Sequence, residues 1–201
     1  MIICIGREFG SGGHEIGKRL AENLGYNFYD RDLVEKSLAR TTIPSEEIER
    51  ADERKINPLL YRVWYDSQDE SLRGMSANDI LFRIQSKLIS DIARKGNCIF
   101  IGRSADFILQ KAGIDHISLF IAAPFEDRLR REMKLLNISE KEASSLIRRT
   151  DKERKSYYNY YTDRDWGKPS NYDFCINSSK FGIDKTVEFL TDFFKKSSRR
   201  R

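Results

Sequence analysis

Proline, cysteine and long apolar runs are all scarce in this chain of 201 residues, and each shortage excludes a class of protein. Only 4 prolines and 12 glycines occur, which argues against a collagen-like or low-complexity chain. No apolar stretch reaches the roughly 18 residues of a membrane-spanning helix. The apolar run after Met1 is interrupted by Gly6 and Arg7, so it is too short for a secretory signal. We therefore expect a cytoplasmic protein.

The three cysteines lack the spacing of a metal site or a disulfide framework. No CxxC pair is present, and cysteines of reducing compartments are rarely paired. Each of the three lies inside a short apolar run, which is typical of a strand. We expect Cys4, Cys98 and Cys175 to be buried strand residues.

Excess charge is also lacking outside the end of the chain. The net charge is +5, from 36 basic and 31 acidic residues, and the last seven residues carry five positive charges and no negative ones. The rest of the chain is neutral, so it provides no basic stripe for nucleic-acid phosphates. We expect a solvated tail, and partners that are neither nucleic acids nor membranes.

Short β-rich runs alternate with longer helical patterns, and the length suits one domain over residues 1–201. Continuous apolar runs predict parallel strands covered on both faces. The expected strands span residues 1–5, 26–29, 98–101, 117–121 and 172–176. Helices are expected between them, with stops at Gly25 and Gly96 and a final helix over about 183–194. This order predicts an α/β fold with a doubly wound, five-stranded parallel sheet, whose ligands collect beyond the carboxyl ends of the strands.

Two segments interrupt this alternation. Residues of about 41–75 are polar and irregular, and we interpret them as a helical insertion. The second segment is an arginine-rich region at about 139–168, which begins with a helical pattern of its own. Ser139 and Glu142 have the spacing of a capping box at the start of that helix.

A glycine-rich turn, GREFGSGGHE, joins the first strand to the first helix. Backbone N–H groups of such a turn converge on an anion, and the helix N-terminus adds partial positive charge. Alternatively, the glycines serve only a tight turn that needs positive φ. The residues expected to hold a phosphate are Gly10, Ser11, Gly12, Gly13, His14 and Glu15.

The turn lacks the two side chains of a regular GxxxxGK[ST] loop. Gly13 takes the place of the lysine and Glu15 the place of the hydroxyl residue. Glu15 is then either a ligand of Mg²⁺ or a sign of altered chemistry. We hypothesise that Arg7 reaches over the loop and replaces the missing positive charge.

With this loop and the motifs that follow it, the chain resembles the cytidylate kinases, in particular the divergent cytidylate kinase-like proteins. The resemblance runs from Met1 to about Lys185. It rests on GSGG in the loop, YDRD after the second strand, GRSADFIL, HISLFIAAPFEDRLRRE, the DxxR spacing of DKER, and YDFCINSS. It implies a P-loop NTPase-like fold, a nucleoside-monophosphate-binding insertion at 41–75 and an arginine-rich lid at 139–168.

The resemblance also implies roles for individual residues. Arg103 would bind the acceptor nucleotide, Asp151 its ribose and Arg154 its phosphate or base. Asp30 and Lys36 stand near the family's acceptor-binding positions, although Lys36 replaces an arginine and loses its bidentate fork. Ser104 replaces an aspartate, and whether Asp106 compensates stays open.

Arg148 and Arg149 would stabilise the transferred phosphoryl group, with Arg7, as catalytic cations. The implied reaction moves the γ-phosphoryl of ATP, with Mg²⁺, to a CMP-like or dCMP-like acceptor. Two alternatives stay open: a nucleotide- or anion-binding module that has lost catalysis, and a kinase for a different small acceptor.

Overall fold

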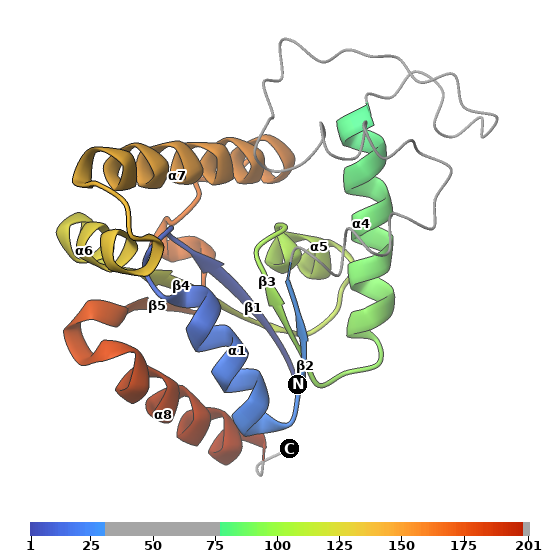
Figure 1. The fold of residues 1–201 in the computed structure, drawn as a ribbon. Coiled ribbons are helices and arrows are strands. Elements are labelled where there is room, and N and C mark those ends of the chain that lie inside the picture. The colour runs from blue at the N-terminus through green and yellow to red at the C-terminus, as the bar shows by residue number, and fades with distance from the viewer. Residues whose placement is uncertain (31–76, 199–201) are drawn as a thin grey trace.

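Five parallel strands form the sheet that the apolar runs predict (Figure 1). The computed structural model describes residues 1–30 and 77–198, so the expected insertion at 41–75 and Lys36 lie outside the described residues. Within these ranges the strand order is β2-β3-β1-β4-β5, and every neighbouring pair is parallel. The strands are β1 (Ile2–Arg7), β2 (Asn27–Tyr29), β3 (Cys98–Ile101), β4 (Ile117–Ala122) and β5 (Phe174–Asn177).

Six α-helices surround this sheet in the described part of the chain. They are α1 (Gly13–Leu24), α4 (Ala77–Ala93), α5 (Ala105–Lys111), α6 (Phe125–Leu136), α7 (Glu140–Thr162) and α8 (Ser178–Ser198). The expected start of the last helix at about residue 183 coincides with a kink, since Gly182 has non-helical backbone angles inside α8.

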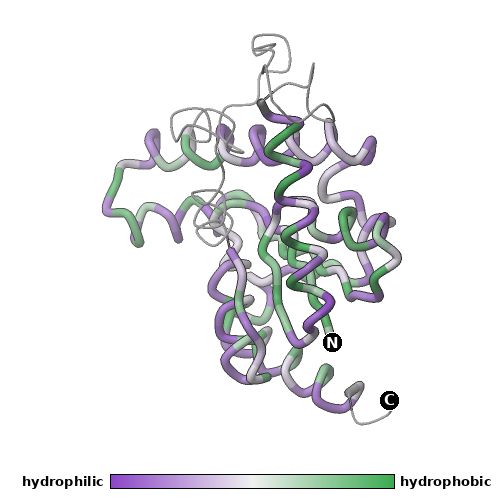
Figure 2. The backbone as a smooth tube through the Cα atoms, turned by 90° about the vertical axis from the view of Figure 1, so that its right-hand side faces the viewer, coloured by the Kyte–Doolittle hydropathy of each residue, from purple (hydrophilic) through white to green (hydrophobic). Residues whose placement is uncertain are grey.

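The sheet is buried on both faces, as the lack of alternation in its strands predicts. Ile3 and Ile5 of β1 pack with α1 and α8, whereas Ile2 and Cys4 pack with α4 and α5. Figure 2 shows the central strands as hydrophobic stretches among helices that carry the hydrophilic residues. The doubly wound α/β fold is thereby confirmed.

Two local signals read from the sequence are confirmed by the backbone. Gly25 ends α1 with a φ of 67°, and its N–H donates to the carbonyls of Ala21 and Glu22. At the start of α7, the Glu142 N–H donates to Ser139 Oγ, and the Ser139 N–H donates to Glu142 Oε2 at 2.9 Å. The α6–α7 turn is thus fixed by the expected capping box.

The prediction of buried cysteines is correct for Cys4 and Cys98 and wrong for Cys175. β5 lies at the edge of the sheet, and its residues alternate between half-buried and exposed positions. Cys175 falls on the exposed side because only one face of this edge strand is covered. An apolar run of three residues cannot distinguish an edge strand from a central one.

Helices α6 and α7 form a separate layer beyond the carboxyl ends of the strands (Figure 1). They pack on each other through Leu129, Ala143 and Ile147, and Phe9 from the glycine-rich loop joins this cluster. The loop therefore lies between the sheet and the helix pair. Ligand sites of α/β sheets are found at this edge.

Candidate functional site

The glycine-rich loop is held in a conformation that only glycine adopts readily. Gly10 and Gly12 have φ of 80° and 76°, in the left-handed region where a Cβ is strained. The buried Ser11 hydroxyl donates to the Glu8 carbonyl at 2.8 Å and accepts from the Gly13 N–H at 3.3 Å. α1 begins at this point without a side-chain cap, which leaves the positive end of the helix available to an anion.

Arg7 connects this loop with a neighbouring pocket. A Cβ added to Gly13 would lie 2.6 Å from Arg7 Cβ, and one added to Gly102 would lie 2.1 Å from Arg7 Nη1. The side chain therefore passes the loop at Gly13, and its guanidinium lies against Gly102, directly after β3. Only the stem of Arg7 therefore contacts the loop, and its charge lies at the edge of the pocket described next.

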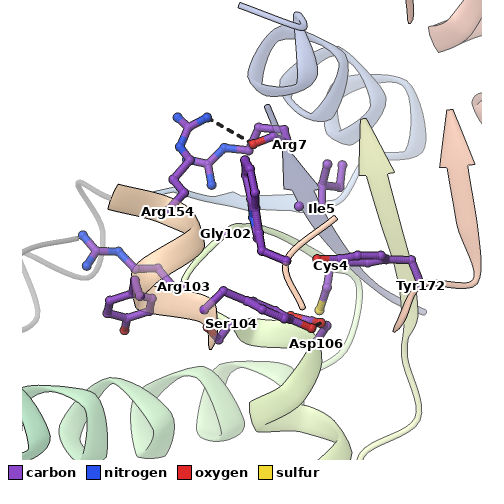
Figure 3. A pocket seen from close by; sticks show the side chains of 13 residues that line it. Cys4, Ile5, Arg7, Gly102, Arg103, Ser104, Asp106, Arg154 and Tyr172 are labelled. Atoms are coloured by element: carbon purple, nitrogen blue, oxygen red, sulfur yellow. Dashed lines mark hydrogen bonds between the residues drawn. The ribbon is translucent and has the colours of Figure 1, made fainter. Parts of the chain in front are cut away.

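That pocket lies at the carboxyl ends of β1 and β3, beneath α7 (Figure 3). The cavity itself has a volume of about 20 Å³, which is room for about one water molecule. Arg7, Arg103 and Arg154 are among the residues that line it. Arg154 Nη1 donates to the Arg7 carbonyl at 3.1 Å, which ties α7 to the end of β1 (Figure 3).

The backbone that carries Arg103 is strained. Gly102, Arg103 and Ser104 have φ of 71°, 60° and 52°, and two non-glycine residues in succession rarely adopt this region. The turn buries Arg103, which is 5% exposed, and Ser104. The Ser104 hydroxyl has no hydrogen-bond partner among the described residues and lines the pocket. Such strain is typical of a site where side-chain placement matters more than stability.

The pocket floor holds the carboxyl group of Asp106. The Tyr158 hydroxyl donates to Asp106 Oδ2 at 2.8 Å, and both residues line the pocket together with Tyr172 and Trp166. Burial raises the pKa of Asp106, and its hydrogen bonds and His116 oppose this shift. Burial also raises the pKa of Tyr158, and the nearby Asp106 carboxylate adds to that shift.

Replacing Asp106 by asparagine is expected to change how stability depends on pH. Because the folded pKa of Asp106 lies above its ordinary 3.8, the native state favours the neutral carboxyl. The wild type should lose stability as the pH rises from that value through the raised folded pKa, and the loss should be complete above it. Asp106→Asn lacks this ionisable group. The melting temperature of the wild type should therefore fall relative to that of the variant as the pH rises from 3.8 to the folded pKa of Asp106. A constant difference between the two melting temperatures from pH 3.5 to 7 would contradict the expectation.

Asp151 lies outside this pocket, and its carboxylate binds the glycine-rich loop and α6 instead. Its carboxylate accepts from the Phe9 N–H at 2.7 Å and from Arg128 Nη1 at 2.6 Å. Arg128, only 7% exposed, also donates to the carbonyls of Ala123 and Phe9. We call this group, Arg128 with Asp151 and the Phe9 backbone, the clasp, because it joins α6, α7 and the loop.

A second chain of charges crosses the loop on the side of α8. Arg131 Nη2 donates to Glu15 Oε2 at 2.7 Å, and Arg19 lies 3.5 Å from the other oxygen of Glu15. Arg19 also pairs with Asp184 at 2.7 Å. The Cζ atom of Arg131 is 3.8 Å from the point that a Cβ of Gly12 would occupy. Arg131 is therefore the arginine whose guanidinium carbon lies near Gly12, whereas Arg7 and Arg128 approach Gly13 and Gly10 with the stems of their side chains.

The remaining residues singled out from the sequence are dispersed. His14 Nε2 lies 3.1 Å from Asp30 Oδ2, so these two expected ligands are brought together at the exposed rim of α1 and β2. The exposed Arg148 stacks on the Phe125 ring at 4.6 Å, and Arg149 is exposed on the same helix. Neither residue lines the pocket.

Residues 2–180 match the sequence profile of the cytidylate kinase-like family. The chain belongs to this family. It is 27% identical to a cytidylate kinase of Methanocaldococcus jannaschii over 193 residues, which cover 95% of this chain and 96% of that protein. A cytidylate kinase of Staphylothermus marinus is 24% identical over 198 residues, covering 98% and 97% of the two chains.

Solved structures agree with the fold of this cytidylate kinase-like chain. An uncharacterised protein from Eubacterium ventriosum matches with a TM-score of 0.72 and 26% identity, covering 97% of this chain and 98% of that one. Shikimate kinase from Bacteroides thetaiotaomicron matches with a TM-score of 0.56 and 15% identity, over the same shares of the two chains. The sheet order 2-3-1-4-5 is therefore that of a P-loop kinase fold.

The cytidylate kinase-like site thus gathers some of the expected residues and separates others. Arg7, Arg103, Asp106 and Arg154 share one pocket, whereas Asp151 is bound into the clasp. Sequence reasoning missed Arg128 and Arg131. The available signal was their spacing of three residues in APFEDRLRRE, which puts both on one face of a helix.

Among residues 1–30 and 77–198, no helix combines the length and hydropathy that crossing a membrane requires.

Proposed function

We propose that this cytidylate kinase-like protein transfers the γ-phosphoryl group of ATP to a nucleoside monophosphate of the CMP or dCMP kind. The observation that carries the proposal is a pocket lined by three arginines beside a glycine-rich loop. Arginine is suited to phosphate because its planar fork donates two parallel hydrogen bonds. A pocket for a neutral ligand would not need Arg7, Arg103 and Arg154 together.

The donor phosphates would be held by the loop. Its left-handed glycines and the uncapped start of α1 supply backbone N–H groups and partial positive charge. The acceptor monophosphate would bind at Arg103 and Arg154, at the edge of this small pocket. The hydroxyl of Ser104 is a polar group there that can donate to or accept from the base.

Arg7 lies where the transferred group would pass from one side to the other. Its stem contacts the loop at Gly13 and its guanidinium contacts Gly102 at the pocket. Phosphoryl transfer spreads negative charge over the equatorial oxygens, and catalysis consists mainly of positioning and electrostatic stabilisation. Arg7 would supply that stabilisation from a fixed place.

Magnesium bound together with ATP would reduce the negative charge of the phosphates. It takes one or two protein oxygens in such sites, and phosphates and waters supply its other ligands. In the described residues, no three His, Cys, Asp or Glu side chains form a group that could hold a metal alone. Glu15 is the carboxylate at the start of α1 that fits this limited role, although here it is bonded to Arg131.

Measurement of ADP formation from Mg-ATP tests the proposal, with CMP, dCMP, UMP and AMP as acceptors and a reaction without acceptor. We expect turnover with a pyrimidine monophosphate and a loss of about a hundredfold or more in Arg103→Ala. Arg130→Ala, on the exposed side of α6, is the matched control and should retain activity. Absence of acceptor-dependent ADP formation would overturn the kinase assignment.

One observation favours a second function, a nucleotide-binding module without turnover. The loop lacks a lysine and a hydroxyl at the expected places, and α6 and α8 pack closely on Gly10 and Gly12. ATP binding detected by calorimetry, without ADP formation for any acceptor, would support this function.

A further inference from the structure

We propose that Arg131 and Glu15 form a latch on the phosphate loop: Arg131 is the cation that substitutes for the missing lysine, and Glu15 holds it until a polyphosphate displaces the carboxylate. The inference rests on the proposed function and extends it, because it names the residue that binds the donor phosphates and the residue that regulates it.

The position of Arg131 supports the first half of the inference. Between Gly10 and Glu15 the loop has no lysine or arginine, and the guanidinium of Arg7 lies at Gly102. The Cζ atom of Arg131 is 3.8 Å from the point that a Cβ of Gly12 would occupy. A phosphate bound to the backbone of Gly12 and Gly13 would therefore meet this guanidinium.

The contacts of Glu15 support the second half. One carboxylate oxygen accepts from Arg131 at 2.7 Å and the other lies 3.5 Å from Arg19. Arg19 is also bound to Asp184, so Glu15 keeps a second cationic neighbour after Arg131 leaves. The Glu15 side chain is 45% exposed and that of Arg131 is 28% exposed, so water can solvate both groups when they separate.

The charges favour replacement of the Glu15 carboxylate by a phosphate as the partner of Arg131. Exposed ion pairs contribute little to stability, whereas an arginine bonded to phosphate makes stronger, often bidentate hydrogen bonds. A polyphosphate beside an intact Glu15 carboxylate would also be repelled. Glu132, whose side chain lies against Gly10, is 7% exposed, and burial raises its pKa, which lowers its tendency to carry charge there.

The same carboxylate could instead serve as the Mg²⁺ ligand considered from the sequence. The two roles make opposite predictions for Glu15→Gln. A latch that is removed should increase anion affinity with or without magnesium. A metal ligand that is removed should decrease affinity, and only when magnesium is present.

Calorimetric titration of Mg-ATP, magnesium-free ATP and inorganic tripolyphosphate into the full chain separates these roles. We expect Glu15→Gln to bind each ligand roughly two- to fivefold more tightly than wild type. Arg131→Gln should bind about tenfold or more weakly, and Arg131→Lys should recover part of the affinity. The double variant should resemble Arg131→Gln, because Glu15 acts only through that arginine. Glu22→Gln and Arg130→Gln, exposed on the same helices, are the matched controls.

Each alternative result has a definite meaning. Equal dissociation constants for all variants would overturn the latch and leave the proposed function standing. Magnesium-dependent weakening in Glu15→Gln would overturn the latch in favour of a metal ligand. Tripolyphosphate binding in the expected order without ATP binding would support the latch and overturn the kinase assignment. Failure of the wild type to bind any of the three ligands would overturn both.

Discussion

Replacing Arg128 by alanine is expected to lower the free energy of unfolding by about 3 kcal/mol. Arg128 Nη1 donates to Asp151 at 2.6 Å and to the Phe9 carbonyl at 3.1 Å, and its Nε donates to the Ala123 carbonyl at 3.0 Å. Alanine leaves these acceptors and a largely buried carboxylate without their donor. For a chain of this length, the melting temperature should fall by roughly 6–12 °C.

Arg130 provides the control for this substitution. It is exposed on the same helix and pairs only with Asp127 among the described residues, so Arg130→Ala should melt within about 2 °C of the wild type. Asp151→Asn should also destabilise, and the double variant Arg128→Ala/Asp151→Asn should lose less than the sum of the single losses. Equal melting temperatures for Arg128→Ala and Arg130→Ala would show that the clasp contributes nothing.

The same series decides between two roles of Asp151. The family resemblance implies a bond to the acceptor ribose, whereas the geometry gives its carboxylate to Phe9 and Arg128. If the clasp is its whole role, Asp151→Asn should lower stability and leave the acceptor KM unchanged. A rise in the acceptor KM at unchanged kcat would favour the ribose contact.

Much of the fold could be predicted because its signals are local. The apolar run before Gly6 predicts a strand covered on both faces, and Ile3 and Ile5 are indeed buried on one face with Cys4 on the other. Gly25 and the Ser139–Glu142 pair mark helix ends through bonds that span only a few residues. Cys175 could not be placed in this way, because its exposure depends on the position of β5 in the sheet.

The site was less predictable because its contacts join distant segments. Arg7 was singled out for its place beside the loop, yet its direction depends on Gly102, which is far away in the sequence. The four predicted residues that share the pocket end a strand, follow one or lie in the DKER helix, and the topology brings them to one edge of the sheet. Arg131 and Glu15 are separated by 116 positions, and no local pattern indicates that they meet.

The clasp and the latch have a common consequence for the loop. Arg128 fixes the loop through the Phe9 backbone, and Arg131, one turn later on α6, lies against Gly12. If the proposed latch is correct, one helix both supports the glycine-rich loop and provides the cation for a bound phosphate. Since the loop has no lysine between Gly10 and Glu15, the proposal makes it depend on α6 for structure and for charge, through two arginines on one face of the helix.

Replacing Gly102 by alanine is expected to reduce acceptor-dependent ADP formation by about a hundredfold, although no charged group is removed. A Cβ at this position would lie 2.1 Å from Nη1 of Arg7. The guanidinium must therefore leave its position against Gly102 at the edge of the pocket. Since misplacement by about 1 Å can cost two orders of magnitude in rate, Gly102→Ala should approach the kcat/KM of Arg7→Ala. Steady-state kinetics of both variants with the preferred acceptor measures this.

Gly113 separates displacement of Arg7 from simple backbone strain. Gly102 and Gly113 both adopt the left-handed region, with φ of 71° and 65°, but a Cβ at Gly113 would meet nothing within 4 Å. Both alanine variants should therefore lose similar stability, about 1 kcal/mol, and only Gly102→Ala should lose turnover. If the two variants had equal kcat/KM, the position of Arg7 would not matter for transfer. If Gly102→Ala were impaired while Arg7→Ala kept full activity, the damage would lie in the turn that carries Arg103, and the acceptor site alone would account for catalysis.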